Sequence, residues 1–383
     1  MTSILREALI NSSYRRMPVS REFNALDTGM RRYDDKRINQ RFTRFSVFLL
    51  LTLICLPAQQ AFADELLMRD GSRLLGKVVR REGGILEFET SYAGMIKIKW
   101  EEISELHADE PMKLMLEDES TLTAQHIRNT EAGILLDDNI EADQATQSLA
   151  QSELAFINPD PWRTGDGYKL DGRINFAFQK ERGNTDKDEI DADGDLTWRF
   201  HHDRFRLFGE FERDRSNNKK IKDKWKLNNN YDRFITKKWY AGAVLGFEHD
   251  QFAELNLRTI AGPKMGYQWF ESKEMNLSTE IGPMYTDEDF DTDQDGDYVA
   301  MGWGINFDKY VFGEFMQLYH RQNGLWNLED TGDLVWNTWT GLRFPLILGV
   351  VASTEMQVEY NSGAAKNADD VDTTYSLKLG YAW

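Results

Sequence analysis

From Tyr168 to the C-terminus, apolar and polar residues alternate in segments of about ten residues. In one such segment Ile190, Ala192 and Leu196 stand at even-numbered positions, with aspartates between them. A period of two is the pattern of a β-strand whose two faces meet different surroundings. Twelve such segments can be counted, at 168–183, 188–201, 204–215, 222–235, 238–249, 256–270, 274–286, 297–307, 310–321, 332–344, 349–361 and 371–383.

The length and number of these segments favour a membrane barrel over a soluble sheet. A tilted transmembrane β-strand needs about ten residues, and single-chain bacterial barrels have an even number of strands. We therefore expect an all-β protein in which residues 167–383 form a twelve-stranded antiparallel transmembrane β-barrel. The ninth segment, 310–321, has the least regular alternation.

The connections between the segments differ in length at the two ends of the expected barrel. The odd-numbered ones read GNTDKDE, DRSNNKKIKD, HDQFAELN, DEDFDTDQDGD, QNGLWNLEDTGD and NSGAAKNADDVD. The even-numbered ones contain only HHD, TKK, ESKE, DKY and FPLIL. Short periplasmic turns and longer outer loops are typical of bacterial barrels, so the chain is predicted to enter the barrel from the periplasm.

The polar face of the segments carries charges of both signs, as the lumen of a barrel does. Two interpretations follow: a water-filled pore with charge selectivity, or a set of ion pairs that fills a narrow barrel. Twelve strands lie between packed and open barrels, so size alone leaves both interpretations standing. The candidate pore-lining residues are Arg173, Arg199, Arg206, Lys226, Arg258, Lys264, Glu280, Arg343 and Glu355.

The chain ends on an alternating segment whose last residue is aromatic. Such an ending resembles the signal by which the barrel-assembly machinery recognises outer-membrane barrels. The candidate assembly signal consists of Tyr375, Leu377, Leu379, Tyr381 and Trp383.

The first 63 residues read as an N-terminal extension followed by a secretory signal peptide. Arg41 and Arg44 precede an apolar run from Phe45 to Leu56, and the small-x-small pattern at 61–63 suits cleavage before Asp64. The apolar run is too short to span a membrane as a helix, which needs about 20 residues. Cys55, the only cysteine, lies within this run, so the mature chain is expected to contain no disulfide.

Residues 64–150 are expected to form a small β-rich, SH3-like or Sm-like domain in the periplasm. Short strands with Gly turns are predicted at 72–81, 85–92 and 95–103. Several residues recur 48 positions later, among them Asp70 at Asp118 and Ser72 at Ser120, which suggests two copies of one β-unit or a chance similarity. Residues 151–166 are predicted to be a linker, and the periplasmic partner of this domain is unknown.

Composition limits the classes of function. The chain has 46 basic and 64 acidic residues among 383, and its net charge of −18 argues against nucleic-acid binding. A negative mean hydropathy excludes a helical membrane bundle but not a barrel, which presents only alternate residues to lipid.

The stretch 289–297 contains D-x-D-x-D-G, the opening of an EF-hand calcium loop. The twelfth position of such a loop needs Glu, but Gly302 stands there. A looser, weak divalent-cation site at Asp291, Asp293 and Asp295 is the remaining metal candidate, and a solvated acidic loop is the alternative. His249 beside Asp250 is the candidate for hydrolase chemistry, but no serine nearby has a distinctive context.

Residues 183–200 and 247–272 carry a family resemblance. The Gly183-Asn184-Thr185 element and the strand with Arg258, Gly262 and Gly266 resemble the DUF481 (YdiY-like) family, described as outer-membrane or salt-stress-induced proteins. The resemblance covers roughly 167–383. It implies the location and the fold more than a biochemical activity, and it carries over no catalytic residues.

These observations lead to a Gram-negative outer-membrane barrel, embedded in lipid and lipopolysaccharide, that acts as a narrow channel or in envelope maintenance, with a link to salt stress implied by the resemblance. A structural or adhesion protein using its acidic loops and periplasmic domain is the alternative, and an outer-membrane hydrolase is a third. We expect no enzymatic activity, no catalytic residues and no cofactor beyond weak divalent-cation binding.

Overall fold

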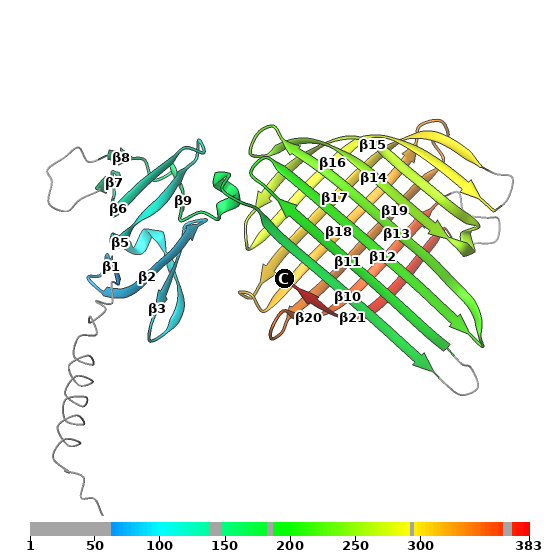
Figure 1. Ribbon diagram of the computed structural model, residues 1–383, viewed down its shortest axis with the longest axis horizontal. Helices are drawn as coiled ribbons and strands as arrows, with labels where there is room; N and C mark the ends of the chain where they lie inside the picture. The colour runs from blue at the N-terminus through cyan, green and yellow to red at the C-terminus, as the bar shows by residue number, and fades with distance from the viewer. Residues whose placement is uncertain (1–62, 138–146, 182–186, 292–294, 363–369) are drawn as a thin grey trace, which may run out of the picture. The chain divides into compact units, whose positions relative to one another are not determined.

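The structure is a computed structural model that describes residues 63–137, 147–181, 187–291, 295–362 and 370–383. The predicted N-terminal extension and signal peptide lie outside these residues, apart from Ala63. The described residues form two separate sheets, an amino-terminal β-domain and a closed barrel (Figure 1). No helix in the described ranges is long and apolar enough to cross a membrane.

The alternating segments form an antiparallel barrel in which each strand pairs with the next and the last pairs with the first. The prediction of a twelve-stranded barrel is therefore confirmed. The strands are β10 (Lys169–Glu181), β11 (Lys187–Arg199), β12 (Asp203–Ser216), β13 (Lys219–Phe234), β14 (Trp239–Asp250), β15 (Leu255–Glu271), β16 (Met275–Phe290), β17 (Gly296–Val311), β18 (Met316–Asn327), β19 (Leu334–Pro345), β20 (Val350–Asn361) and β21 (Val371–Ala382).

The ninth barrel strand lies further along the chain than the sequence predicts. Strand β17 continues to Val311, and β18 begins at Met316 rather than at 310. The turn between them contains Phe312 and Gly313, whose φ angles of 55° and 73° are left-handed. The charged stretch DKY, predicted as the turn, is strand because Asp308 faces the interior and pairs with Arg321 at 2.7 Å.

The third connection is much shorter than the ten residues predicted from DRSNNKKIKD. Strand β12 runs to Ser216 and β13 starts at Lys219, so only Asn217 and Asn218 join them. Their φ angles are 49° and 64°. Asparagine tolerates this left-handed conformation, and two such residues in succession make the tight turn that suits a twisted hairpin.

The amino-terminal β-domain is a nine-stranded sheet with the order β4-β3-β2-β1-β5-β6-β7-β8, and β9 pairs with both β2 and β5. Its core is aliphatic and aromatic, with Leu66, Leu86, Phe88 and Leu114 buried. The strands are β1 (Asp64–Met68), β2 (Arg73–Glu82), β3 (Ile85–Thr90), β4 (Gly94–Lys99), β5 (Ile103–Leu116), β6 (Thr121–Thr130), β7 (Gly133–Asp137), β8 (Gln147–Leu149) and β9 (Leu154–Ile157).

The offset of 48 residues recurs in the structure of this domain. Strand β6 begins and ends 48 residues after β2, and the turns before them are built alike. The backbone N–H of Ser72 donates to Asp70 Oδ1 at 2.8 Å, and that of Ser120 donates to Asp118 Oδ1 at 3.0 Å. These serines lower the pKa of both carboxyl groups from 3.8. The geometry therefore favours two copies of one β-unit over a chance similarity.

The predicted linker 151–166 contains part of the sheet. Leu154 and Ile157 of β9 are buried in the core of the β-domain, and Arg81 Nη1 donates to the carbonyl of Leu154 at 2.7 Å. The linker prediction is wrong for these residues. It relied on Pro159 and Pro161 as helix and strand breakers, whereas the apolar side chains just before them pack into the core of the β-domain.

Candidate functional site: the charged interior of the barrel

The barrel has an apolar exterior and a charged interior. Along β12, Arg204 is 4% exposed whereas its neighbour Phe205 is 47% exposed. The same inversion occurs along β13, where Asp232 is buried between the exposed residues Tyr231 and Arg233. Apolar residues on the outside and charged residues inside are the arrangement of a barrel that faces lipid.

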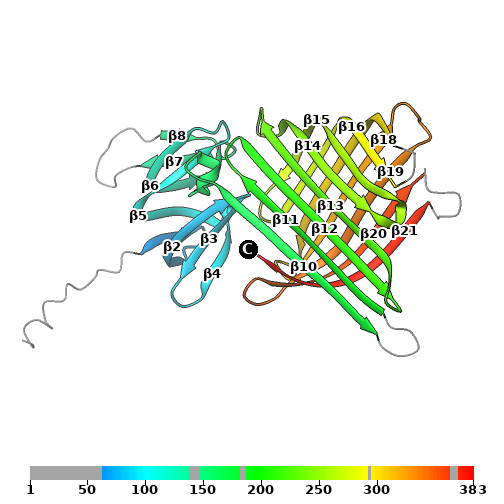
Figure 2. The ribbon, with the colours of Figure 1, turned by 45° about the vertical axis from the view of Figure 1, so that its right-hand side comes forward.

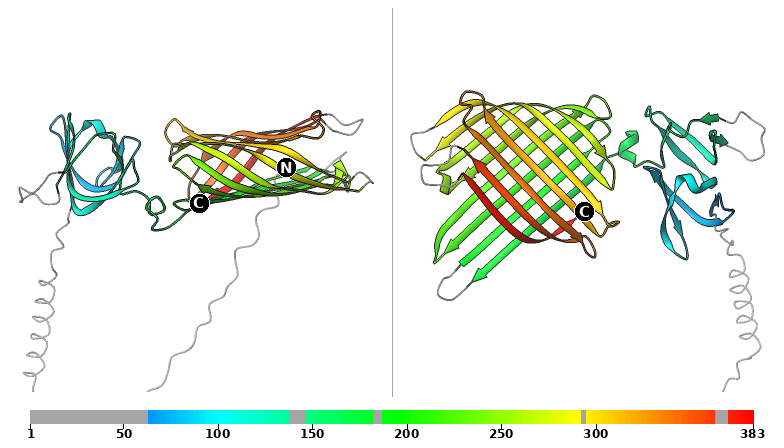
Figure 3. Two further views of the ribbon diagram at one scale, coloured as in Figure 1. Left: turned by 90° about the horizontal axis from the view of Figure 1, so that it is seen from above. Right: turned by 180° about the vertical axis from the view of Figure 1, so that it is seen from behind.

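A cavity of about 950 Å³ is lined mainly by inward-facing side chains of the barrel. All nine candidate pore-lining residues contribute to its lining. Figure 3 (left) shows why distant strands meet here, since the orange and red strands form one wall and the green strands another that faces it. The interior can thus be crossed by side chains that are far apart in sequence.

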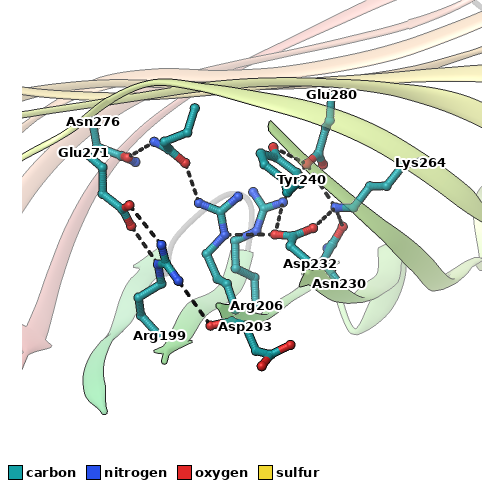
Figure 4. Close-up of polar contacts among 12 residues, drawn as sticks. Arg199, Asp203, Arg206, Asn230, Asp232, Tyr240, Lys264, Glu271, Asn276 and Glu280 are labelled. Atoms are coloured by element: carbon teal, nitrogen blue, oxygen red, sulfur yellow. Dashed lines mark hydrogen bonds and ion pairs between the residues drawn. The ribbon is translucent and has the colours of Figure 1, made fainter. Parts of the chain in front are cut away.

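The first group of charges, here called the Asp232 cluster, contains Arg204, Arg206, Asp232, Lys264 and Glu280 (Figure 4). Asp232 lies 2.8 Å from Arg204 Nε, 3.1 Å from Arg206 Nη2 and 3.0 Å from Lys264 Nζ. Glu280 lies 2.6 Å from Arg206 Nη2 and 2.9 Å from Lys264 Nζ. The two carboxylates, on β13 and β16, thus hold three cations from β12 and β15 close together.

Neutral side chains add hydrogen bonds to this cluster. Tyr240 donates its hydroxyl to Glu280 at 3.1 Å, and Lys264 donates to Asn230 Oδ1 at 2.7 Å. Gln268 accepts from Arg204 at 2.6 Å and donates to Asn276 at 2.6 Å. The buried charges are therefore both paired and hydrogen-bonded, which is the condition for retaining ions inside a protein.

Arg199 continues this layer toward the end of the barrel that carries the C-terminus. Its guanidinium contacts both carboxylate oxygens of Glu271, at 2.9 and 3.2 Å, and the contact is visible in Figure 4. Such a two-point contact fixes the guanidinium plane as well as its distance. Because Arg199 lies on β11 and Glu271 ends β15, the pair joins strands that are not neighbours.

The second group, here called the Glu359 bridge, crosses the barrel. Glu359 on β20 lies 2.5 Å from Lys224 Nζ and 2.6 Å from Lys226 Nζ, both on β13. Lys226 also donates to Asn337 at 3.3 Å. Asn337 lies on β19, which is six strands away from β13 in either direction around the ring. Opposite walls of the barrel are therefore in direct polar contact.

An apolar contact and a chain of further ions accompany this bridge. The rings of Phe208 on β12 and Trp339 on β19 meet edge to face, with centroids 5.6 Å apart. Lys226 is also 3.4 Å from Glu248, which lies 2.9 Å from Arg258. The interior at this level is occupied by side chains rather than by one wide channel.

The third group lies near the junction of the first and last strands. Lys378 contacts Asp193 at 2.6 Å and Glu355 at 2.7 Å, and Tyr319 donates its hydroxyl to Glu355 at 2.9 Å. The remaining predicted lining residues are paired as well. Arg173 contacts Asp195, and Arg343 lies 2.8 Å from Asp308.

Sequence reasoning missed several members of these groups as site residues, including Arg204, Asp232, Tyr240 and Gln268. Each of these residues lies at an inward-facing position of the alternating pattern of its strand. The period of two therefore could have identified them as interior residues. The choice of the nine candidates by charge alone left out neutral hydrogen-bonding partners.

The candidates for hydrolase and metal chemistry lie apart from these groups. His249 packs against Trp225 on the outward face, with ring centroids 6.1 Å apart, whereas Glu248 points inward. Asp295 accepts a hydrogen bond from the backbone of Phe290 at 2.9 Å, Asp291 is exposed, and Asp293 is outside the described residues. Within the described ranges, no group of three His, Cys, Asp or Glu side chains is placed to hold a metal ion.

The candidate assembly residues lie along the last strand, β21, and at the residue just after it. Tyr375, Leu377, Leu379 and Tyr381 point outward from β21 and are exposed, and Trp383 stacks beside Tyr381 with centroids 6.1 Å apart. The backbone of Trp383 exchanges two hydrogen bonds with Gly172, at 3.0 and 3.2 Å. A Cβ on Gly172 would lie 2.3 Å from the Trp383 ring, so glycine permits this closure.

Comparison with known proteins identifies the barrel. The model of DUF481, described as a protein family of unknown function, matches residues 174–383, more than half of the chain. The chain belongs to the DUF481 family. The resemblance expected from the sequence of this DUF481 protein is thereby confirmed.

Solved structures and curated proteins add little to this DUF481 assignment. The NanC porin is 10% identical with a TM-score of 0.35, and the match covers 56% of this chain and 98% of the porin. CdiB from Acinetobacter baumannii is 7% identical with a TM-score of 0.25, and the match covers 84% and 59% of the two chains. No curated protein matches the sequence.

Proposed function

We propose that this DUF481 protein is an outer-membrane β-barrel of a Gram-negative bacterium, with its amino-terminal β-domain in the periplasm. In this proposal the barrel is a narrow channel for ions and small hydrophilic solutes, and the Glu359 bridge holds it closed. The outer-membrane location is supported by the apolar exterior of the barrel and by the aromatic residues on its outward face, such as Trp198 and Trp336.

The contact of Glu359 with Lys224 and Lys226 is the observation that carries the channel proposal. It joins opposite walls through three flexible side chains, not through the backbone, so it can open without unfolding the barrel. Lys226 of this bridge also lines the cavity, whose walls carry charges of both signs. Because interactions between charges in water-filled spaces are screened by salt, high ionic strength is expected to favour the open state.

Planar-bilayer recording on the purified full chain tests this proposal. Raising KCl from 0.1 to 1 M shortens the screening length from about 10 Å to about 3 Å. The open probability should therefore rise, and the mean current should increase by more than the conductivity of the solution. Absence of conductance steps at any voltage, at both salt concentrations, would overturn the channel.

A structural role in the envelope is the second candidate. It is favoured by the contact between the aromatic rings of Phe208 and Trp339, which joins opposite walls of the barrel through apolar side chains. A barrel of this kind would remain non-conducting even after the carboxylate of Glu359 is removed. The recording above therefore separates the two candidates when the variant Glu359→Gln is included.

A further inference from the structure

The seam that closes the barrel is paired over only part of its length. The register between β10 and β21 covers four residue pairs, from Arg173 with Ala382 to Phe176 with Leu379. By contrast, the register between β10 and β11 extends without a break along β10 from Lys169 to Glu181. In the described part of the chain, no residue of β21 before Leu379 is paired with β10.

The two strands separate toward the end of the barrel far from the C-terminus. Figure 2 shows β10 and β21 close together near the C-terminus and diverging from there. Continued by two residues, the register would place Phe178 opposite Leu377. The outward side chains at this level are more open than those of the paired strands: Phe178 is 67% exposed, Tyr375 77% and Leu377 78%, against 47% for Phe205.

A partly paired seam has a physical consequence in a membrane. Backbone N–H and C=O groups that face lipid without partners are costly, so closed barrels normally pair their strands completely. The stretch of β21 from Thr374 to Lys378 spans roughly 17 Å, a large part of the hydrocarbon layer. Such an edge is stable only if water or a polar ligand from the interior hydrogen-bonds to it. Otherwise the open seam must be one state of a seam that also closes.

The interior side of the seam is polar, and its charged residues Lys378, Asp193 and Glu355 are paired. Lys378 lies directly inside the last paired residues and contacts Asp193 and Glu355. Asn175 donates to Asp193 at 2.7 Å. A headgroup with one net charge would leave a buried charge without a partner, which is strongly unfavourable. A headgroup with both a positive and a negative charge can exchange partners with these ion pairs and leave none uncompensated.

We propose that the β10–β21 seam is a lateral gate through which a single-chain, zwitterionic amphiphile passes between the interior of the barrel and the membrane. The headgroup occupies the charged cavity, and the single acyl chain lies in the gap between Phe178 and Leu377. This proposal rests on the membrane location given under the proposed function but not on ion conduction. In the orientation proposed above, the gate opens into the outer leaflet.

Disulfide cross-linking across the seam tests the gate. In a Cys55→Ser background, Phe178→Cys with Leu377→Cys would join the strands in the open part. The matched control, Ile174→Cys with Tyr381→Cys, joins a pair that is already in register. Both pairs face outward, and they would occupy equivalent places in the ladder if the register continued along the seam. Heat-dependent gel mobility checks that each variant has folded.

The readout is the movement of lysophosphatidylcholine with a fluorescent acyl chain across phosphatidylcholine vesicles containing the full chain. The wild type should accelerate this movement at least tenfold over protein-free vesicles. Oxidation of the 178/377 pair should abolish the acceleration, a reductant should restore it, and oxidation of the 174/381 pair should leave it unchanged. Conductance is recorded on the same samples, so a failed gate and a failed channel are distinguished.

Three results would overturn the gate. The first is that the wild type does not accelerate movement of the probe. The second is that the oxidised 178/377 variant moves the probe as fast as the oxidised 174/381 control. The third is that the 178/377 cysteines link two chains on a non-reducing gel, which would show that a second copy of the protein covers the open edge.

Discussion

Glu359 and Lys226 form an ion pair, 2.6 Å between Oε1 and Nζ, that joins strands on opposite walls of the barrel. The two residues are separated by 133 positions in the sequence. Each also belongs to a wider network, because Glu359 holds Lys224 and Lys226 contacts Glu248. This pair therefore places charged side chains across the lumen, between opposite walls.

Replacing Glu359 by Gln should open the barrel. The lysines lose the partner that draws them across the lumen, and Lys224 and Lys226 retain Glu212 and Glu248, each at 3.4 Å. We expect a several-fold higher conductance and a shift of selectivity toward anions, measured in planar bilayers. Glu254→Gln removes the same charge at an exposed connection and should leave conductance as in the wild type.

Replacing Asp232 by Asn should destabilise the barrel strongly. The change leaves Arg206 and Lys264 with Glu280, and it removes the carboxylate that pairs with Arg204. Breaking a buried ion pair by removing one partner costs about 3–5 kcal/mol. Urea unfolding in detergent micelles, followed by tryptophan fluorescence, measures the change. Asp291→Asn, at an exposed position, serves as the control, and equal midpoints for the two variants would contradict the role of this cluster.

Replacing Gly266 by Ala should disturb Tyr240. A Cβ at Gly266 would lie 2.1 Å from the Tyr240 ring, which is buried and donates its hydroxyl to Glu280. Overpacking of this kind costs about 1–3 kcal/mol. Gly296→Ala meets nothing within 4 Å and should change the unfolding free energy little. The same urea titration compares the two variants.

Replacing Arg81 by Ala should loosen β9 in the amino-terminal β-domain. Arg81 Nη1 donates to the carbonyls of Leu154 and Ala155, at 2.7 and 3.1 Å, and burial lowers its pKa to about 10. Leaving these carbonyls without a partner costs about 1–3 kcal/mol. Hydrogen exchange on the full chain should show faster exchange in 154–157. Arg73→Ala, which removes an exposed pair with Glu65, should leave exchange there unchanged.

The inward and outward faces of the strands could be predicted from the sequence because the period of two is a local property of an extended backbone. Arg199, Arg258 and Lys264 were assigned to the interior on this basis alone, and they line the cavity. The prediction of strand ends from the sequence failed where a run of charged residues resembled a turn. Asp308 was taken as a turn residue because it is charged, although its charge is paired inside the barrel with Arg321 and Arg343.

The sequence by itself determined the number of strands, the faces of most of them and the alternation that makes the outside apolar. Only the tertiary structure decided which charges meet. Whether Glu359 reaches Lys226, or Glu271 reaches Arg199, depends on the spacing of the barrel walls and on the register of every intervening strand. The incomplete seam between β10 and β21 has the same origin, because closure is a property of the whole ring and no single segment contains it.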